Sequence, residues 1–156
     1  MGLPGHSGGA STNPKHVSLW ATLVLMVAVV SLLLRRSLFA RGPILIALQV
    51  VAAALMLWAR VTFGARSFHA GANPTGGGLV TTGPYRFVRH PIYSAVLLFL
   101  WAGVAAHGSI LSLLTAVVAT AAVAMRIVTE ENLVAETYPE YAEYARHTKR
   151  IIPYVV

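Results

Sequence analysis

Two polar stretches of this chain carry residues that could bind and position a charged small molecule. Residues 81–93, TTGPYRFVRHPIY, combine tyrosine, arginine and histidine side chains. A second stretch begins at Arg126, and all five acidic residues of the chain follow it, from Glu130 to Glu143. Arg126 and Glu130 are four residues apart, a spacing that places both on one face of a helix. The two stretches together therefore offer a carboxylate, guanidinium groups and aromatic rings.

The elements that must position these residues are strongly apolar. The chain is 56% hydrophobic and only 11% charged. Its four apolar segments are residues 17–34, 44–59, 91–106 and 108–125. None carries a charged side chain, and each has about the length at which a helix crosses a hydrocarbon core of roughly 30 Å. The sequence therefore predicts an all-α integral membrane bundle of about four transmembrane helices.

The C-terminal half is predicted to bring the two polar stretches to one membrane surface. His107 and Gly108 leave room only for a tight turn, which predicts an antiparallel hairpin of the last two apolar segments. Residues 126–138 show the apolar spacing of an amphipathic helix. Pro139 breaks this helix or starts a second one, which we expect to lie on the membrane surface and to end at Pro153.

Charge and composition indicate how the chain is organised. Residues 1–16, rich in Gly, Ser and Pro, are expected to be a flexible tail, residues 17–59 two transmembrane helices, and residues 60–156 the functional core. Arg35, Arg36 and Arg41 follow the first apolar segment, and the other nine of the twelve Lys and Arg fall on the face with both termini. This bias predicts a cytoplasmic location for that face.

Several function classes are disfavoured by composition. The basic residues flank apolar segments, so anionic lipid headgroups rather than nucleic acid are the expected partners. The absence of cysteine excludes disulfides and thiolate chemistry. His69, His107 and His147 lack metal-ligand spacing, and no metal is expected. A channel or transporter is disfavoured because no ionisable residue lies within an apolar segment.

Each polar residue also has a structural interpretation. Arg86 and Arg89 could be interfacial anchors, Tyr85 and Tyr93 could belong to an aromatic belt, and the pair four residues apart could be a surface ion pair of little energetic value. The combination favours a functional site, because a glutamate placed where a helix leaves the membrane faces a cluster of His, Arg and Tyr.

The motifs resemble a family of membrane enzymes. LVTTGPYRFVRHPIY, then a tight hairpin, then RIVTEENL and YPEYAEYARHTKRIIPY resemble the isoprenylcysteine carboxyl methyltransferases, which are related to phospholipid N-methyltransferases. The resemblance covers about residues 60–156. It implies the cofactor S-adenosylmethionine on the cytoplasmic side and Arg126 as the residue that binds the acceptor. The cofactor-binding positions that it implies are Leu79, Val80, Tyr85, His90, Pro91, Tyr93 and Glu130.

Two points of this correspondence stay open. Glu131 takes the role of Glu130 if the register is shifted by one residue. The family often has a histidine just before the Leu-Val pair, whereas residues 76–78 are glycines here, so the backbone or His69 could replace that contact.

The implied chemistry agrees with the residue types. Methyl transfer from a sulfonium is an in-line displacement that depends mostly on positioning. Glu130 could anchor the positively charged cofactor, Arg89 or backbone amides could bind its carboxylate, and Arg126 could hold a carboxylate acceptor through two parallel hydrogen bonds. We expect methyl transfer to a lipid-tailed acceptor, first of all the carboxylate of an isoprenylcysteine-like substrate. The alternatives are a phospholipid or other lipid-amine N-methyltransferase, and a non-catalytic membrane anchor or partner-binding protein.

Overall fold

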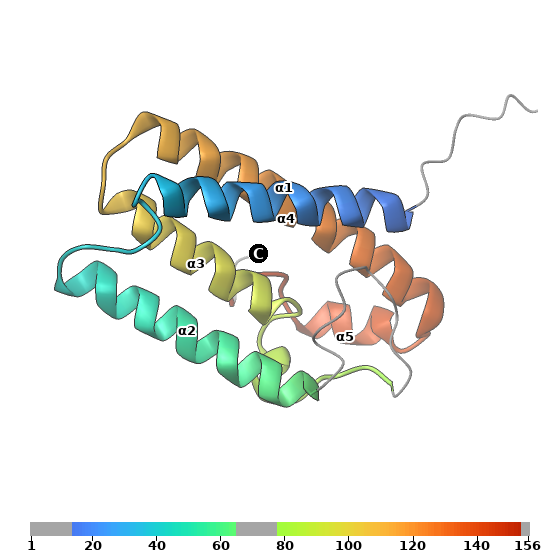
Figure 1. Ribbon diagram of the computed structural model, residues 1–156. Helices are drawn as coiled ribbons and strands as arrows, with labels where there is room; N and C mark the ends of the chain where they lie inside the picture. The colour runs from blue at the N-terminus through green and yellow to red at the C-terminus, as the bar shows by residue number, and fades with distance from the viewer. Residues whose placement is uncertain (1–13, 65–77, 154–156) are drawn as a thin grey trace, which may run out of the picture.

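The fold is an all-helical bundle, as predicted. The computed structural model describes residues 14–64 and 78–153. Its elements are α1 (Pro14–Leu34), α2 (Pro43–Phe63), the 3-10 helix η2 (Gly83–Arg86), α3 (Pro91–Ala105), α4 (Ile110–Thr137) and α5 (Tyr141–His147). Figure 1 shows two layers, in which α4 packs mainly against α1 and α3 packs mainly against α2. The short α5 lies beneath the C-terminal half of α4.

Within residues 14–64 and 78–153, three helices have the length and composition to cross a membrane. They are His16–Leu34 of α1, α2 and α4. Large apolar side chains cover their outer faces, and Trp20, Val27 and Val61 are each at least 68% exposed. Such surfaces suit a lipid environment, because water would penalise so much exposed apolar area. The apolar α3 has 15 residues and is about 22 Å long, so the expected fourth crossing stays a prediction.

Proline and glycine set the helix ends. Pro43 and Pro91 occupy the first turns of α2 and α3, where their missing N–H has no cost. Gly108, with φ of 59°, lies in the turn between α3 and α4, which confirms the predicted tight hairpin. Helix α1 begins at Pro14, three residues before the predicted start of the first transmembrane helix at Val17. Residues 1–13 lie outside the described part of the chain.

The connection between α1 and α2 is tied to α3 by a buried glutamine. The Nε2 of Gln49 donates to Leu38 O at 2.8 Å and to Phe99 O at 3.0 Å. Its Oε1 accepts from Ala40 N at 2.9 Å. These bonds satisfy a polar side chain that would otherwise be costly inside an apolar helix. The connection therefore sits close to α3, where Gly103 leaves the space for it.

The predicted amphipathic helix forms the C-terminal part of α4. With 28 residues, α4 is about 42 Å long and exceeds the hydrocarbon thickness of roughly 30 Å, which leaves its last turns for the interface. It ends at Thr137, before Pro139, as expected. The expectation that the second helix ends at Pro153 is wrong, because α5 ends at His147. The chain beyond it is extended and pairs with Val88, which a helix could not do.

We predict that Gly103→Ala destabilises the bundle. A Cβ at this position would lie 2.2 Å from Leu38 O, a backbone atom held by Gln49, so the connection must shift. We expect a loss of about 2 kcal/mol or more, measured as a lower midpoint of thermal unfolding in detergent. Ala105→Ser adds one heavy atom at an exposed position of the same helix and should have little effect. Equal midpoints for the two variants would contradict the packing described here.

Candidate active site

The C-terminal segment docks against the polar motif of residues 81–93. Arg89 N donates to Lys149 O at 2.7 Å, and His90 N donates to Arg150 O at 3.0 Å. Val88 forms a parallel bridge with Lys149. These backbone bonds join segments about sixty residues apart in sequence, and they require an extended chain after α5. The predicted meeting of the motif with the C-terminal segment is confirmed.

Glu131 is the centre of the ion pairs that hold this segment. Its carboxylate lies 2.9 Å from the Nε of Arg89, 3.3 Å from the Nε2 of His90 and 2.8 Å from the Nη2 of Arg150. Arg89 also donates through Nη1 to Ala145 O at 3.0 Å. The side chains of Arg89 and Glu131 are only 11% and 10% exposed, so this pair is shielded from water and salt.

Glu130 belongs to a second cluster, with Tyr93 and Arg126. The hydroxyl of Tyr93 donates to Glu130 Oε1 at 2.5 Å, and Arg126 Nε donates to the Tyr93 oxygen at 2.6 Å. Arg126 Nη2 lies 2.8 Å from Glu130 Oε1, which confirms the predicted pair on one helix face. The Glu130 side chain is 23% exposed and that of Arg126 only 8%, so the carboxylate is the more accessible partner.

The two neighbouring glutamates thus have different partners, and His90 contacts both. Its Nδ1 lies 3.9 Å from Glu130 Oε2, while its Nε2 faces Glu131. The His90 ring also packs against Tyr93, with ring centroids 5.7 Å apart. Successive helix positions point about 100° apart, so one glutamate faces Arg126 and the other faces the C-terminal segment.

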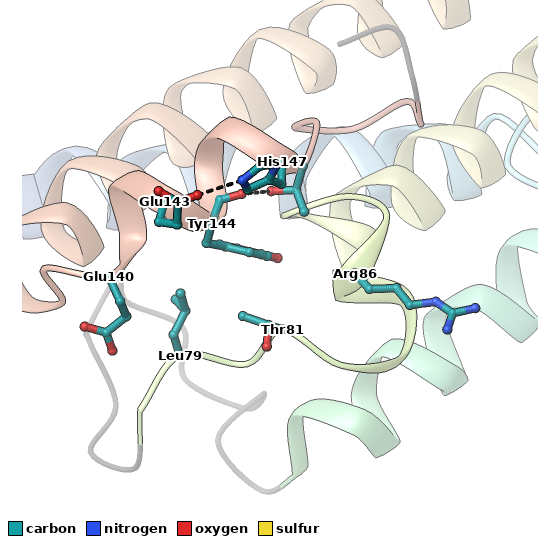
Figure 2. Close-up of a pocket in the computed structure, with 8 residues that line it drawn as sticks. Leu79, Thr81, Arg86, Glu140, Glu143, Tyr144 and His147 are labelled. Atoms are coloured by element: carbon teal, nitrogen blue, oxygen red, sulfur yellow. Dashed lines mark hydrogen bonds and ion pairs between the residues drawn. The ribbon is translucent and has the colours of Figure 1, made fainter.

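An open pocket of about 530 Å³ lies between α5 and the chain that precedes η2. Its lining residues are Leu79, Thr81, Arg86, Glu140, Glu143, Tyr144, His147 and Thr148. In Figure 2, Leu79 and Thr81 lie across from the Tyr144 ring, and Arg86 extends away from them. Leu79 is the one predicted cofactor residue in this lining. Sequence reasoning placed the α5 residues on a surface helix and did not assign them to a site.

Tyr85 contacts Tyr144 in the wall of this pocket. Its carbonyl oxygen accepts a hydrogen bond of 2.6 Å from the hydroxyl of Tyr144, and its ring packs on Phe63 with centroids 5.5 Å apart. Burial, together with the charges of Tyr144 and Glu130, raises the pKa of Tyr85 well above its usual value. Burial also raises the pKa of Tyr144 to about 12. Both hydroxyls therefore stay protonated at neutral pH, and that of Tyr144 donates its hydrogen bond to Tyr85 O.

The α5 wall of the pocket carries one carboxylate, that of Glu143, which is paired with Arg146 and His147. Hydrogen bonds from His147 and Arg146 lower the pKa of the exposed carboxyl of Glu143. The Nε2 of His147 lies 2.7 Å from its Oε1. Glu143 is therefore ionised at neutral pH, and with Glu140 it gives the pocket carboxylates that suit a positively charged ligand.

Two further predicted site residues, Val80 and Pro91, lie at least partly inside the protein. Val80 is half-buried next to Leu79, and Pro91 is buried at the start of α3. His69 and the glycines at 76 and 77 lie outside the described residues. Among the residues that the structure describes, no group of three or more His, Asp or Glu is arranged to hold a metal ion.

Comparison with known proteins identifies the family of this chain. Residues 37–141 match the family model for phospholipid methyltransferase, which covers α2, the motif, α3 and all of α4. The chain belongs to the phospholipid methyltransferase family. This family shares a superfamily of membrane methyltransferases with the isoprenylcysteine carboxyl methyltransferases, so the resemblance noted in the sequence holds at the level of the superfamily. With its three long apolar helices, this methyltransferase-family chain is an integral membrane protein.

One curated relative matches part of the chain. The cobalt-zinc-cadmium resistance protein CzcN of Cupriavidus metallidurans is 42% identical over 80 residues, which is 48% of this chain and 35% of that protein. The chain therefore spans about a third of the length of the curated relative that it matches. No solved structure matches the chain.

We predict that Glu131→Gln loosens the C-terminal segment. The substitution removes the charge of Glu131, so the shielded guanidinium of Arg89 loses its anionic partner. We therefore expect the free energy of unfolding to fall by about 2 kcal/mol. Cleavage of the segment after α5 by an added protease should also accelerate. Glu136→Gln, at an exposed position of the same helix, is the control. If Glu131→Gln resists heat and protease as well as Glu136→Gln, the cluster does not hold the segment.

Proposed function

We propose that this protein transfers a methyl group from S-adenosylmethionine to a lipid-linked acceptor at the membrane surface. The observation that carries the proposal is the partly exposed carboxylate of Glu130, which is paired with Arg126 and Tyr93 at one end of an apolar bundle. The family match supports the reaction class. A site at the end of the membrane helices can be reached by membrane lipids and by a lipid-tailed or prenylated acceptor. We assign this end of the bundle to the cytoplasmic side of the membrane.

The residues around the pocket fit this cofactor. Its volume of about 530 Å³ lies within the range of roughly 300–1,000 Å³ that small-molecule sites occupy. Leu79 and Tyr144 would hold the adenosine, and the carboxylates of Glu130 and Glu143 would attract the positive sulfonium and ammonium groups. When bound, S-adenosylmethionine supplies an electrophilic methyl group. The contribution of the chain is to hold and orient the reactants and to exclude water.

The other predicted residues have supporting roles in this proposal. His90 and Tyr93 orient the Glu130 carboxylate through their own contacts with it. Tyr85 accepts a hydrogen bond from Tyr144 in the pocket wall, and we assign it to holding that wall in place. Arg89 is engaged by Glu131 and by carbonyl groups of the C-terminal segment, so we assign it to positioning that segment.

A carboxylate acceptor of the isoprenylcysteine type remains our first choice. Arg126 would hold it, because a guanidinium can bind a carboxylate through two parallel hydrogen bonds. In the structure, Nη2 of Arg126 donates to Glu130 and Nε donates to Tyr93. An acceptor carboxylate would take the place of Glu130 at Arg126, which leaves Glu130 for the cofactor.

A lipid amine is the second candidate acceptor. The match to the phospholipid methyltransferase family favours it, and so does the existing pairing of Arg126 with Glu130. For such an acceptor, Arg126 would orient the Glu130 carboxylate, and the carboxylate would face the amine. The two candidates differ in their products, since one is a methyl ester and the other an N-methylated amine.

We predict that Glu130→Gln lowers methyl transfer by about 100-fold or more. The substitution keeps the size of the side chain and removes the charge that orients and attracts the reactants. The measurement is the transfer of labelled methyl groups into the lipid-soluble fraction of proteoliposomes that contain the full chain. Glu136→Gln should keep the activity of the unchanged protein. A Glu130→Gln variant as active as this control would refute the assignment of Glu130.

We predict further that the labelled product is a methyl ester. Mild alkali hydrolyses such an ester and releases volatile labelled methanol, whereas an N-methyl group resists this treatment. The assay uses a prenylcysteine analogue and an amino-headgroup lipid in the same vesicles. Label that is stable to alkali and is found on the amine lipid would assign the second acceptor. A correctly folded protein that transfers no label to either would favour the non-catalytic membrane anchor.

A further inference from the structure

The first helix contributes polar contacts to Arg126. Helix α1 ends before residue 37, where the match to the family model begins. It packs along α4, and the face toward α4 carries Ser18, which is fully buried, and Thr22, which is half-buried. Figure 1 shows the two helices side by side along most of the length of α1. Polar side chains at a helix–helix contact in an otherwise apolar segment need a polar partner.

For the side chain of Thr22, that partner is the guanidinium of Arg126. Its Nη1 donates to the hydroxyl oxygen of Thr22 and lies 3.5 Å from Ser18 O. The hydroxyl of Thr22 donates its own proton to Ser18 O at 2.8 Å. The Thr22 oxygen is thereby turned so that its lone pairs accept from Arg126. Thr22 links the backbone of α1 directly to the residue that we assign to the acceptor.

The contacts from α1 orient the guanidinium without neutralising it. Two of its nitrogens, Nε and Nη2, donate to Tyr93 of α3 and Glu130 of α4. The third, Nη1, is fixed by neutral oxygen atoms of α1. Three helices therefore define the plane of the group. A guanidinium is planar with donors in a rigid fork, so fixing Nη1 also fixes the directions of the other two nitrogens.

We propose that Thr22 is a positioning residue of the active site and that α1 forms part of the acceptor site. The inference rests on the proposed function, since it takes Arg126 as the group that acts on the acceptor. Without the Thr22 hydroxyl, the guanidinium keeps its pair with Glu130 through Nη2 but loses the contact that fixes Nη1, so it can turn away from the direction in which it meets the acceptor. Binding of the cofactor, which we assign to the pocket and to Glu130, does not depend on this contact.

The test compares Thr22→Val with Thr22→Ser and with Thr115→Val. Valine keeps the shape of threonine and removes the hydroxyl, whereas serine keeps the hydroxyl. Thr115 is the matched control, because its hydroxyl also donates to a carbonyl one turn back, Leu111 O at 2.8 Å. The measurements in proteoliposomes are kcat/KM for the acceptor, the Kd for S-adenosylhomocysteine and the midpoint of thermal unfolding.

We expect Thr22→Val to lower kcat/KM for the acceptor about ten-fold, with an unchanged Kd for S-adenosylhomocysteine. Thr22→Ser should restore most of the loss, and Thr115→Val should match the unchanged protein. Equal kcat/KM for Thr22→Val and Thr115→Val would overturn the inference while leaving the proposed function intact. So would a loss in Thr22→Val that comes with an equal loss of cofactor affinity and a lower midpoint, which shows a purely structural role. No methyl transfer by the unchanged protein would instead refute the proposed function itself.

Discussion

A buried guanidinium at the end of an apolar bundle is the constraint on which the site depends. Arg126 is 6% exposed, and burying its charge is favourable only if its donors are satisfied. Tyr93, Glu130 and Thr22 supply the acceptors from three different helices. The need to satisfy one side chain therefore brings α1, α3 and α4 together at one end. It also holds the Glu130 carboxylate in place while leaving it partly open.

A second set of charges, centred on Glu131, holds the C-terminal segment against the same end of the bundle. Glu131 binds Arg89 of the motif and Arg150 of the C-terminal segment, and the backbone of the motif pairs with that segment. Since Glu130 and Glu131 are consecutive residues of α4, this helix couples the pair at Glu130 to the docking of the C-terminal segment. The pocket beside Tyr144 is walled by that same segment, so its shape depends on the Glu131 ion pairs.

Local patterns in the sequence were sufficient to predict the helices and one ion pair of the site, that of Arg126 with Glu130. Apolar runs predict membrane helices, Gly108 predicts the hairpin, and a spacing of four predicts that Arg126 meets Glu130. Contacts between distant segments leave no such pattern. The partners of Glu131 and the contact of Thr22 with Arg126 depend on how the helices pack. The expected helix end at Pro153 was wrong for the same reason, because backbone bonds to the motif end the helix earlier.

The central claim is that the Glu130 cluster and the pocket beside Tyr144 bind S-adenosylmethionine. Calorimetric titration of the detergent-purified full chain with S-adenosylhomocysteine tests it most directly, with Glu130→Gln beside the unchanged protein. Saturable binding that is weakened at least about ten-fold in the variant is the predicted result, since the variant lacks the charge that attracts the ammonium group, which S-adenosylhomocysteine shares with the cofactor. A folded, unchanged protein that does not bind, or a variant that binds equally well, would contradict the claim.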